Sequence, residues 1–154
     1  MKKDVLQNYL KITIPAKSMN EALSRSVISA FISQLDPTIE ELCDLKTAVS
    51  EAVTNCIVHA YRDEADEGKK LIYITADITK GGAVTIRIRD KGCGISDIEK
   101  ALTPMYSGSS SEERSGMGFS IMQVFSDKLT VRSKPGKGTT VSISKHIGKA
   151  YAEN

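Results

Sequence analysis

Apolar side chains in the first third of the chain follow a strand period and then a helix period. Three of them alternate with polar residues and predict a strand over residues 9–16: Leu10, Ile12 and Ile14. Ser18 and Glu21 then form the Ser-x-x-Glu pattern of a capping box, which begins a helix. Behind the cap, apolar side chains recur at every fourth position: Leu23, Val27, Phe31 and Leu35. This repeat predicts an amphipathic helix that buries those four side chains.

A second helix is predicted directly after the first. Pro37 suits its entry turn, and Thr38 with Glu41 repeats the capping-box pattern. The apolar stripe behind this cap is long: Leu42, Leu45, Val49, Ala52, Val53, Cys56 and Ile57. It predicts a helix that ends near Tyr61, and the charged segment 62–70 predicts a solvated loop.

The second half of the chain is predicted to form hairpin-linked strands with two short helices between them. The expected strands are 71–79, 83–90, 129–133 and 139–144, and the expected helices are 97–102 and 119–125. The segment 103–116 is rich in Ser and Gly and predicts a mobile loop. This order indicates an α+β fold, a two-layer sandwich with a mixed, mostly antiparallel sheet and helices on one face. We expect a single domain over 1–154, with a short flexible tail at about 146–154.

Composition and charge restrict the class of protein. The 154 residues are 40% apolar, and the net charge is +2 with no long run of Lys and Arg. Neither nucleic acid nor an anionic membrane is therefore expected as a direct partner. No apolar run approaches the roughly 18 residues of a membrane span. The three cysteines, Cys43, Cys56 and Cys93, form no Cys-x-x-Cys pair, which predicts a reducing, cytoplasmic location and no zinc site.

Glu51 and Asn55 are the first pair with candidate chemistry. They stand four residues apart on the second predicted helix, so they share one face beside its apolar stripe. Asn offers an amide oxygen to a hard cation such as Mg²⁺, and a nearby Glu can orient or deprotonate a nucleophile. Taken alone, such a pair is more often ordinary polar surface of a helix.

Asp90 and Thr139 are predicted at the ends of two core-facing strand rows. Asp90 has the parity of Ile88, and a buried carboxylate needs a hydrogen-bond donor such as the exocyclic amine of adenine. Gly92 and Gly94 would let the chain turn and let a ligand approach closely. The hydroxyl of Thr139 is expected to bind Asp90 or the ligand. The alternatives are a hairpin turn with a solvent-facing Asp, and a Thr present for its β-propensity.

Gly116 and Gly118 open the predicted helix 119–125. Free backbone N–H groups at such a helix start attract phosphate, and Arg114 at the edge of the preceding loop is placed to contact a terminal phosphate. The loop itself is expected to close over the phosphates as a lid. Glycines are otherwise common at helix starts, so a lone Gly-x-Gly is weak evidence for a phosphate site. Two better-known phosphate motifs are excluded, because the P-loop pattern does not occur and Asp97 replaces the third glycine of the dinucleotide fingerprint.

Taken in chain order, these elements resemble the ATP-binding boxes of the gyrase, Hsp90, histidine-kinase and MutL superfamily. Four motifs carry the likeness: Glu51-x-x-x-Asn55, Asp90-x-Gly92-x-Gly94, Gly116-x-Gly118 and Gly138-Thr139-Thr140. Within it, the chain is most similar to the sporulation branch of the anti-sigma factor serine kinases. That likeness rests on Ser50–Asn55, Ile88–Gly92 and Glu113–Phe119, and it extends over about residues 20–144.

The resemblance implies a Bergerat-type ATP-binding fold and a protein serine/threonine kinase that uses ATP and Mg²⁺. Glu51 would be the general base, Asn55 would hold Mg²⁺, and Asp90 would bind the adenine amine with support from Thr139. The remaining residues implied to contact the nucleotide are Gly92, Gly94, Ile95, Arg114, Ser115, Gly116, Met117 and Gly118.

The resemblance also implies partners. The substrate would be an anti-anti-sigma protein phosphorylated on serine, and the chain would bind and inhibit a sigma factor of the sigma-F type. Its relatives are homodimers that dock the sigma factor through the first long helix, where Glu21 and Arg25 match docking positions. On sequence alone, these two residues are a solvated helix face.

The chain departs from the family pattern at a few positions. The lid segment 107–111 lacks the Thr-Thr-Lys-Pro run expected in the sporulation branch, and Cys56 and Cys93 stand where small or aliphatic residues are usual. Three alternatives stay open. They are a nucleotide-dependent sequestering protein without kinase activity, the isolated catalytic domain of a histidine kinase, and a general-stress anti-sigma kinase.

Overall fold

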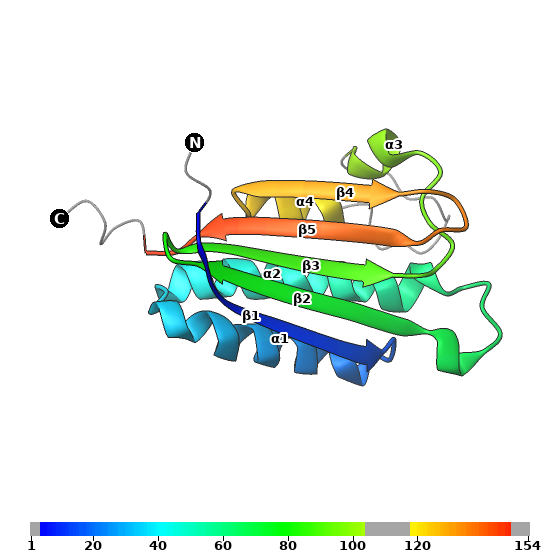
Figure 1. The fold of residues 1–154 in the computed structure, drawn as a ribbon. Coiled ribbons are helices and arrows are strands. Elements are labelled where there is room, and N and C mark those ends of the chain that lie inside the picture. Colours follow the sequence, from blue (N-terminus) through cyan, green and yellow to red (C-terminus); the bar gives the residue numbers. More distant parts are fainter. Residues whose placement is uncertain (1–3, 104–117, 149–154) are drawn as a thin grey trace.

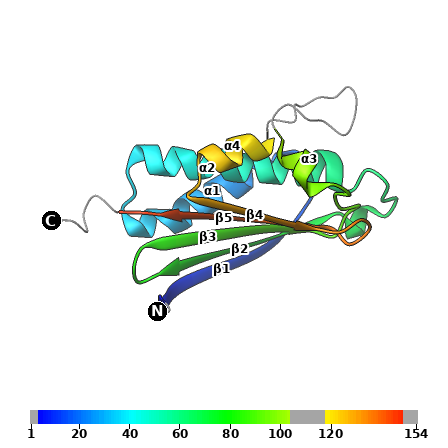
Figure 2. The ribbon, with the colours of Figure 1, turned by 90° about the horizontal axis from the view of Figure 1, so that it is seen from above.

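The computed structural model describes residues 4–103 and 118–148. It is a two-layer sandwich in which a five-stranded sheet carries its helices on one face (Figures 1 and 2). The strand order is β1-β2-β3-β5-β4, and all four pairings are antiparallel. The predicted α+β sandwich is confirmed, and no parallel pairing occurs among the described strands.

The strands follow the predicted alternation closely. They are β1 (Leu6–Pro15), β2 (Leu71–Thr79), β3 (Ala83–Asp90), β4 (Lys128–Ser133) and β5 (Thr139–His146). Every second residue of β2 is buried, at Ile72, Ile74, Ala76 and Ile78, because only one sheet face is covered. The main difference is that β1 begins at Leu6 instead of residue 9.

The helical segments are α1 (Met19–Ile32), η1 (Ser33–Leu35), α2 (Ile39–Asn55), the π-helical η2 (Cys56–Ala60), η3 (Glu67–Lys69), α3 (Ile98–Leu102) and α4 (Gly118–Val124). The two long helices lie where apolar stripes were found, whereas the short 3-10 turn η3 lies in the charged segment 62–70 that was predicted as a loop. The capping box of α2 is confirmed: the Glu41 N–H donates to Thr38 Oγ1 and the Thr38 N–H donates to Glu41 Oε1, both at 3.1 Å. This second helix was predicted to end near Tyr61. It continues to Ala60, but it changes from α to π geometry at Cys56.

Two predictions for α1 are wrong. Ser18 makes no side-chain cap, because its backbone is already helical, with φ −52° and ψ −38°, and its carbonyl oxygen accepts the Glu21 N–H at 3.2 Å. The Glu21 side chain instead accepts the hydroxyl of Ser50 on α2. The buried stripe is also shifted by about one residue: Ser24, Ile28, Phe31 and Ile32 are buried, whereas Leu23 is 46% exposed. A four-residue repeat drifts about 40° per step around a helix, so Leu23 rotates out of the face that packs on the sheet and α2.

The C-terminal segment contacts the first turn of α2. Ile147 is buried, and the Gly148 N–H donates to Glu41 Oε2 at 3.1 Å. Residues 146–148, predicted as the start of a tail, therefore belong to the packed structure, while 149–154 lie outside the described residues.

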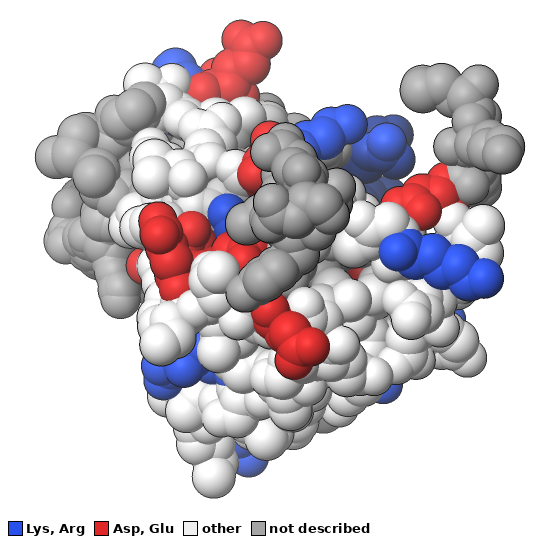
Figure 3. Space-filling model, turned by 90° about the vertical axis from the view of Figure 1, so that its left-hand side faces the viewer, with Lys and Arg blue, Asp and Glu red and all other residues white. Residues whose placement is uncertain are grey.

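The charged side chains at one end of the molecule are of both signs (Figure 3). On the end of the molecule that faces left in Figure 1, acidic and basic side chains are scattered among uncharged ones (Figure 3). Within the described residues, there is no helix with the length and apolarity needed to cross a membrane.

Candidate functional site

Polar residues close the core at one end of the sheet. Asp90 ends β3 and is only 6% exposed, so its predicted place at the end of a core-facing row is confirmed. It lies between Ile72 on β2 and Thr139 on β5, and Thr139 lies opposite Ser133 on β4. Asp90, Thr139 and Ser133 thus form one row across three adjacent strands.

The Asp90 carboxylate is buried but well supplied with donors. Oδ1 accepts the Gly92 N–H at 2.9 Å, Oδ2 accepts the Cys56 thiol at 3.6 Å, and the Thr139 N–H also donates to this carboxylate. Burial raises the pKa of Asp90 above its ordinary value, and these three hydrogen bonds offset part of that rise. A carboxylate of this kind is a fixed acceptor for a ligand donor.

The Thr139 hydroxyl was predicted to bind either Asp90 or the ligand, and the structure shows that it does not bind Asp90. It lies 2.8 Å from Ser133 Oγ, and only the backbone of Thr139 reaches the Asp90 carboxylate. Ser133 also accepts the N–H of Ile95 at 2.8 Å, which brings Ile95 close to Thr139. Sequence reasoning missed Ser133, because a Ser at a strand end carries no distinguishing pattern.

The loop after β3 docks on the π-helical end of the second helix. The Cys93 N–H donates to the Ala60 carbonyl at 2.8 Å, and the Cys93 thiol lies 3.6 Å from the His59 carbonyl oxygen. Tyr61 adds a further tie, since its hydroxyl donates to the Leu71 carbonyl and accepts the Lys91 N–H at 2.8 Å. Burial raises the pKa of Tyr61, which keeps it a neutral donor. Tyr61 was not among the predicted site residues.

Three glycines let neighbouring backbones pack together. A Cβ on Gly92 would overlap the Ala60 carbonyl, one on Gly94 the Lys134 carbonyl, and one on Gly138 the Asp90 carbonyl. Gly94 and Gly138 also have φ of +75° and +83°. At Gly92 and Gly94 the neighbouring backbone of the protein therefore leaves no room for a side chain, and the contact of these two residues with a ligand stays a prediction.

Glu51 and Asn55 face the start of α4. A Cβ on Gly118 would lie 3.4 Å from both Asn55 Nδ2 and Glu51 Oε2. The structure thus brings Glu51, Asn55 and Gly118 together, although they are far apart in sequence. The other predicted phosphate contacts, Arg114 to Met117, lie outside the described residues.

Two consecutive residues of the second helix join these two groups. Asn55, the last residue of α2, lies beside Gly118, and Cys56, the first residue of η2, contacts Asp90. The row of Asp90, Thr139 and Ser133 and the pair Glu51–Asn55 therefore lie next to the same turn of this helix, where α2 becomes η2. The described residues of the predicted motifs thus lie in one region of the molecule.

Glu21 and Arg25, predicted to dock a partner, pair with each other on α1. Arg25 Nε lies 2.9 Å from Glu21 Oε1, and Arg25 Nη2 donates to Glu21 Oε2 at 3.2 Å. Glu21 also accepts the hydroxyl of Ser50, the residue before Glu51. The side chain of Arg25 is 39% exposed, so its outer part is available at the surface.

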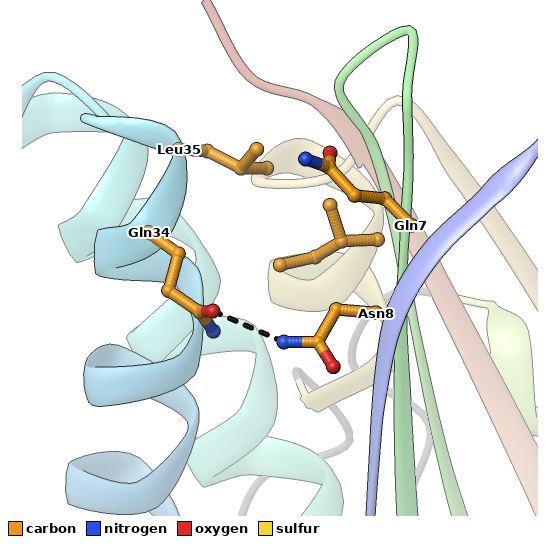
Figure 4. A pocket seen from close by; sticks show the side chains of 5 residues that line it. Gln7, Asn8, Gln34 and Leu35 are labelled. Atoms are coloured by element: carbon orange, nitrogen blue, oxygen red, sulfur yellow. Dashed lines mark hydrogen bonds between the residues drawn. The ribbon is translucent and has the colours of Figure 1, made fainter.

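A separate pocket of about 270 Å³ lies at the other end of the molecule (Figure 4). It is lined by Gln7, Asn8, Gln34, Leu35 and Ile78, and Asn8 Nδ2 donates to Gln34 Oε1 at 3.0 Å. Ile78 is six residues along β2 from Ile72, the partner of Asp90, which corresponds to about 20 Å. This pocket is not part of the predicted site.

Comparison with known proteins identifies the family. The sequence profile of the histidine kinase-like ATPase domain matches residues 14–145. An anti-sigma F factor of Thermoanaerobacter sp. (strain X514) is 51% identical over 141 residues, which cover 92% of this chain and 95% of that protein. This chain belongs to the anti-sigma F factor family of histidine kinase-like ATPases. The anti-sigma F factor of Halalkalibacterium halodurans is also similar, at 46% identity over 96% of this chain and 98% of its own length.

Solved structures agree on the fold. The RsbU and RsbW domains of a Mycobacterium tuberculosis protein match with a TM-score of 0.66 and 17% identity, covering 92% of this chain and 33% of that one. A chain of the SiaB–SiaC complex from Pseudomonas aeruginosa matches with a TM-score of 0.64 and 10% identity, and the match covers 88% of this chain and 88% of that chain. The resemblance inferred from the four motifs is thereby confirmed at the level of family and fold, and membership of an ATPase family implies nucleotide binding.

Proposed function

We propose that this chain is an ATP-dependent protein serine kinase that phosphorylates an anti-anti-sigma protein and also binds and inhibits a sigma factor of the sigma-F type. One observation carries the proposal: Asn55 and Cys56 are consecutive, Asn55 lies beside Gly118, and the Cys56 thiol contacts Asp90. One nucleotide can therefore lie with its base at Asp90 and its phosphates near Asn55.

At the base end, the proposed contacts use fixed acceptors. The Asp90 carboxylate would accept the exocyclic amine of adenine, and Thr139 would support it from the next strand. Gly92, Gly94 and Ile95 would form the adjoining wall, held against the π-helix and the β4–β5 turn. Burial strengthens such hydrogen bonds because the surrounding dielectric is low.

At the phosphate end, Glu51 and Asn55 would carry the chemistry. The Asn55 amide oxygen fits Mg²⁺, which takes few protein ligands when phosphates supply the rest. Among the described residues, no cluster of three or more His, Cys, Asp or Glu side chains offers a separate metal site. The ion would neutralise charge on the phosphates. Glu51 would accept the proton of the substrate serine, and Gly118 with residues 114–117 would bind the phosphates.

The proposed partner surface adjoins this site through α1. Glu21 and Arg25 are proposed to contact the sigma factor, because both side chains are partly exposed on α1 and the related proteins are anti-sigma F factors. The Ser50–Glu21 hydrogen bond links this surface to the residue before Glu51. We further propose that the protein works as a cytoplasmic homodimer.

Incubation with γ-labelled ATP, Mg²⁺ and the anti-anti-sigma protein tests the kinase. The expected product is phosphoserine, and Glu51→Gln should bind ATP normally but lose transfer by about 100-fold or more. Glu40→Gln, an exposed change in the first turn of the same helix, is the matched control. Normal transfer by Glu51→Gln would remove Glu51 as the base.

The same mixtures separate the kinase from its main rival. A sequestering protein would bind ATP and co-elute with the sigma factor in gel filtration, yet yield no labelled product. A labelled phosphohistidine, recognised by its acid lability, would instead favour histidine-kinase chemistry.

A further inference from the structure

Ser133 is the last residue of β4, and its hydroxyl contacts three groups. The Ile95 N–H lies 2.8 Å away, the Gly138 carbonyl oxygen 2.9 Å away and the Thr139 hydroxyl 2.8 Å away. None of the motifs used to recognise the site includes Ser133.

Counting hydrogens assigns every proton in this cluster. A serine hydroxyl has one proton and two lone pairs, a carbonyl only accepts, and a backbone N–H only donates. The proton of Ser133 therefore goes to the Gly138 carbonyl, and its two lone pairs receive the Ile95 N–H and the Thr139 O–H. Thr139 Oγ1 is left with lone pairs and no free proton.

This assignment leaves the side chains of Asp90 and Thr139 as acceptors at the base end of the proposed pocket. Asp90 presents a carboxylate, Thr139 presents lone pairs, and the Ile95 N–H is already used by Ser133. Position 6 of the bound purine, rather than N1, would lie opposite both side chains. The amine of a 6-aminopurine has two protons, one for Asp90 and one for Thr139, whereas the oxygen of a 6-oxopurine has only lone pairs and is repelled by both acceptors.

Resting on the proposed nucleotide site, we propose that Ser133 is a specificity-determining positioning residue: it fixes the Thr139 hydroxyl as an acceptor and so selects 6-amino over 6-oxo purine nucleotides. Ser133 acts through Thr139 and needs no contact with the base. Without it, the Thr139 O–H is free to rotate and donate to a 6-oxo group.

Binding of ATP and ITP by calorimetry tests this role, because the two nucleotides differ only at purine position 6 and its adjoining ring proton. The wild-type chain should bind ATP at least about 10-fold more tightly than ITP. In Ser133→Ala this ratio should contract by about 3- to 10-fold, and Ser133→Thr should restore it. Ser142→Ala, on the uncovered face of β5, is the matched control and should leave the ratio unchanged.

The outcomes are distinguishable. A Ser133→Ala chain that binds both nucleotides more weakly by the same factor has lost only structure, and this result overturns the inference while the proposed function stands. A wild-type chain that binds neither nucleotide overturns the proposed function and this inference with it. If Ser133→Ala does not fold, Thr139→Val removes the acceptor from the other side of the pair. It should contract the same ratio, and an unchanged ratio overturns the inference.

Discussion

Thr139 lies directly opposite Asp90 in the β3–β5 pairing, and its backbone N–H donates a hydrogen bond to the Asp90 carboxylate. Its side chain faces the other neighbour, because the hydroxyl lies 2.8 Å from Ser133 Oγ on β4. One residue thus ties an acidic strand end to the β4–β5 turn. The carboxylate is held in place by this tie, by the Gly92 N–H and by the Cys56 thiol before any ligand arrives.

The loop after β3 depends on glycine at position 92. A Cβ there would overlap the Ala60 carbonyl oxygen and lie 2.8 Å from the Ala60 Cβ. We expect Gly92→Ala to lower the free energy of unfolding by about 3 kcal/mol, measured by urea denaturation, because backbone must move. ATP affinity should fall as well, since the Gly92 N–H holds Asp90.

Gly68→Ala is the control for this substitution. Gly68 has no positive φ, and a Cβ there would meet only Asp66 Oδ1 at 3.3 Å. Its effect should stay within about 1 kcal/mol. Equal losses in the two variants would show that the contact with Ala60 is not the cause.

The affinity for ATP should depend on the ionisation of Asp90. Burial raises the pKa of this carboxyl, so the folded free protein holds a proton that the unfolded chain has already lost. Between the ordinary and the raised pKa, stability of the free protein therefore falls as pH rises. ATP binding has the opposite sense, because the adenine amine needs the ionised acceptor, and affinity should fall as pH falls through the raised pKa.

Calorimetric titration with ATP between about pH 7.5 and 4.5 measures this dependence. Asp90→Asn should bind ATP about 10- to 100-fold more weakly at neutral pH, the range expected for a hydrogen bond to a charged group. It should also lack the carboxylate inflection while retaining the titration of the ATP phosphates. The same pH profile in both chains would contradict the role given to Asp90.

The capping box of α2 should contribute to stability independently of the site. Thr38→Ala removes the acceptor of the Glu41 N–H and should lower the free energy of unfolding by about 1 kcal/mol. Thr47→Ala is the matched control inside the same helix, where Ala has the higher helix propensity. Thermal denaturation of the two variants gives the comparison, and a Thr47→Ala loss as large as that of Thr38→Ala would count against the cap.

Local pattern predicted most of this architecture, and its failures have a common cause. The bounds of β2 and β3 and the burial of Asp90 follow from strict two-residue alternation on a sheet covered on one face. On α1 the four-residue apolar repeat predicted the wrong buried face. Two nearly equivalent apolar stripes were available, and packing against α2 and the sheet selected the one through Ile28 and left Leu23 exposed.

By itself, the sequence determined the element order, the family and the set of residues proposed to hold the nucleotide, because periodicity and motif spacing are local properties of the chain. Only the tertiary structure decided which atoms meet. It turned the Thr139 hydroxyl toward Ser133, placed Gly118 against Asn55, and packed Gly92 on Ala60. Those contacts join segments distant along the chain, and their geometry is set by how the helices and strands pack rather than by the preference of any single segment.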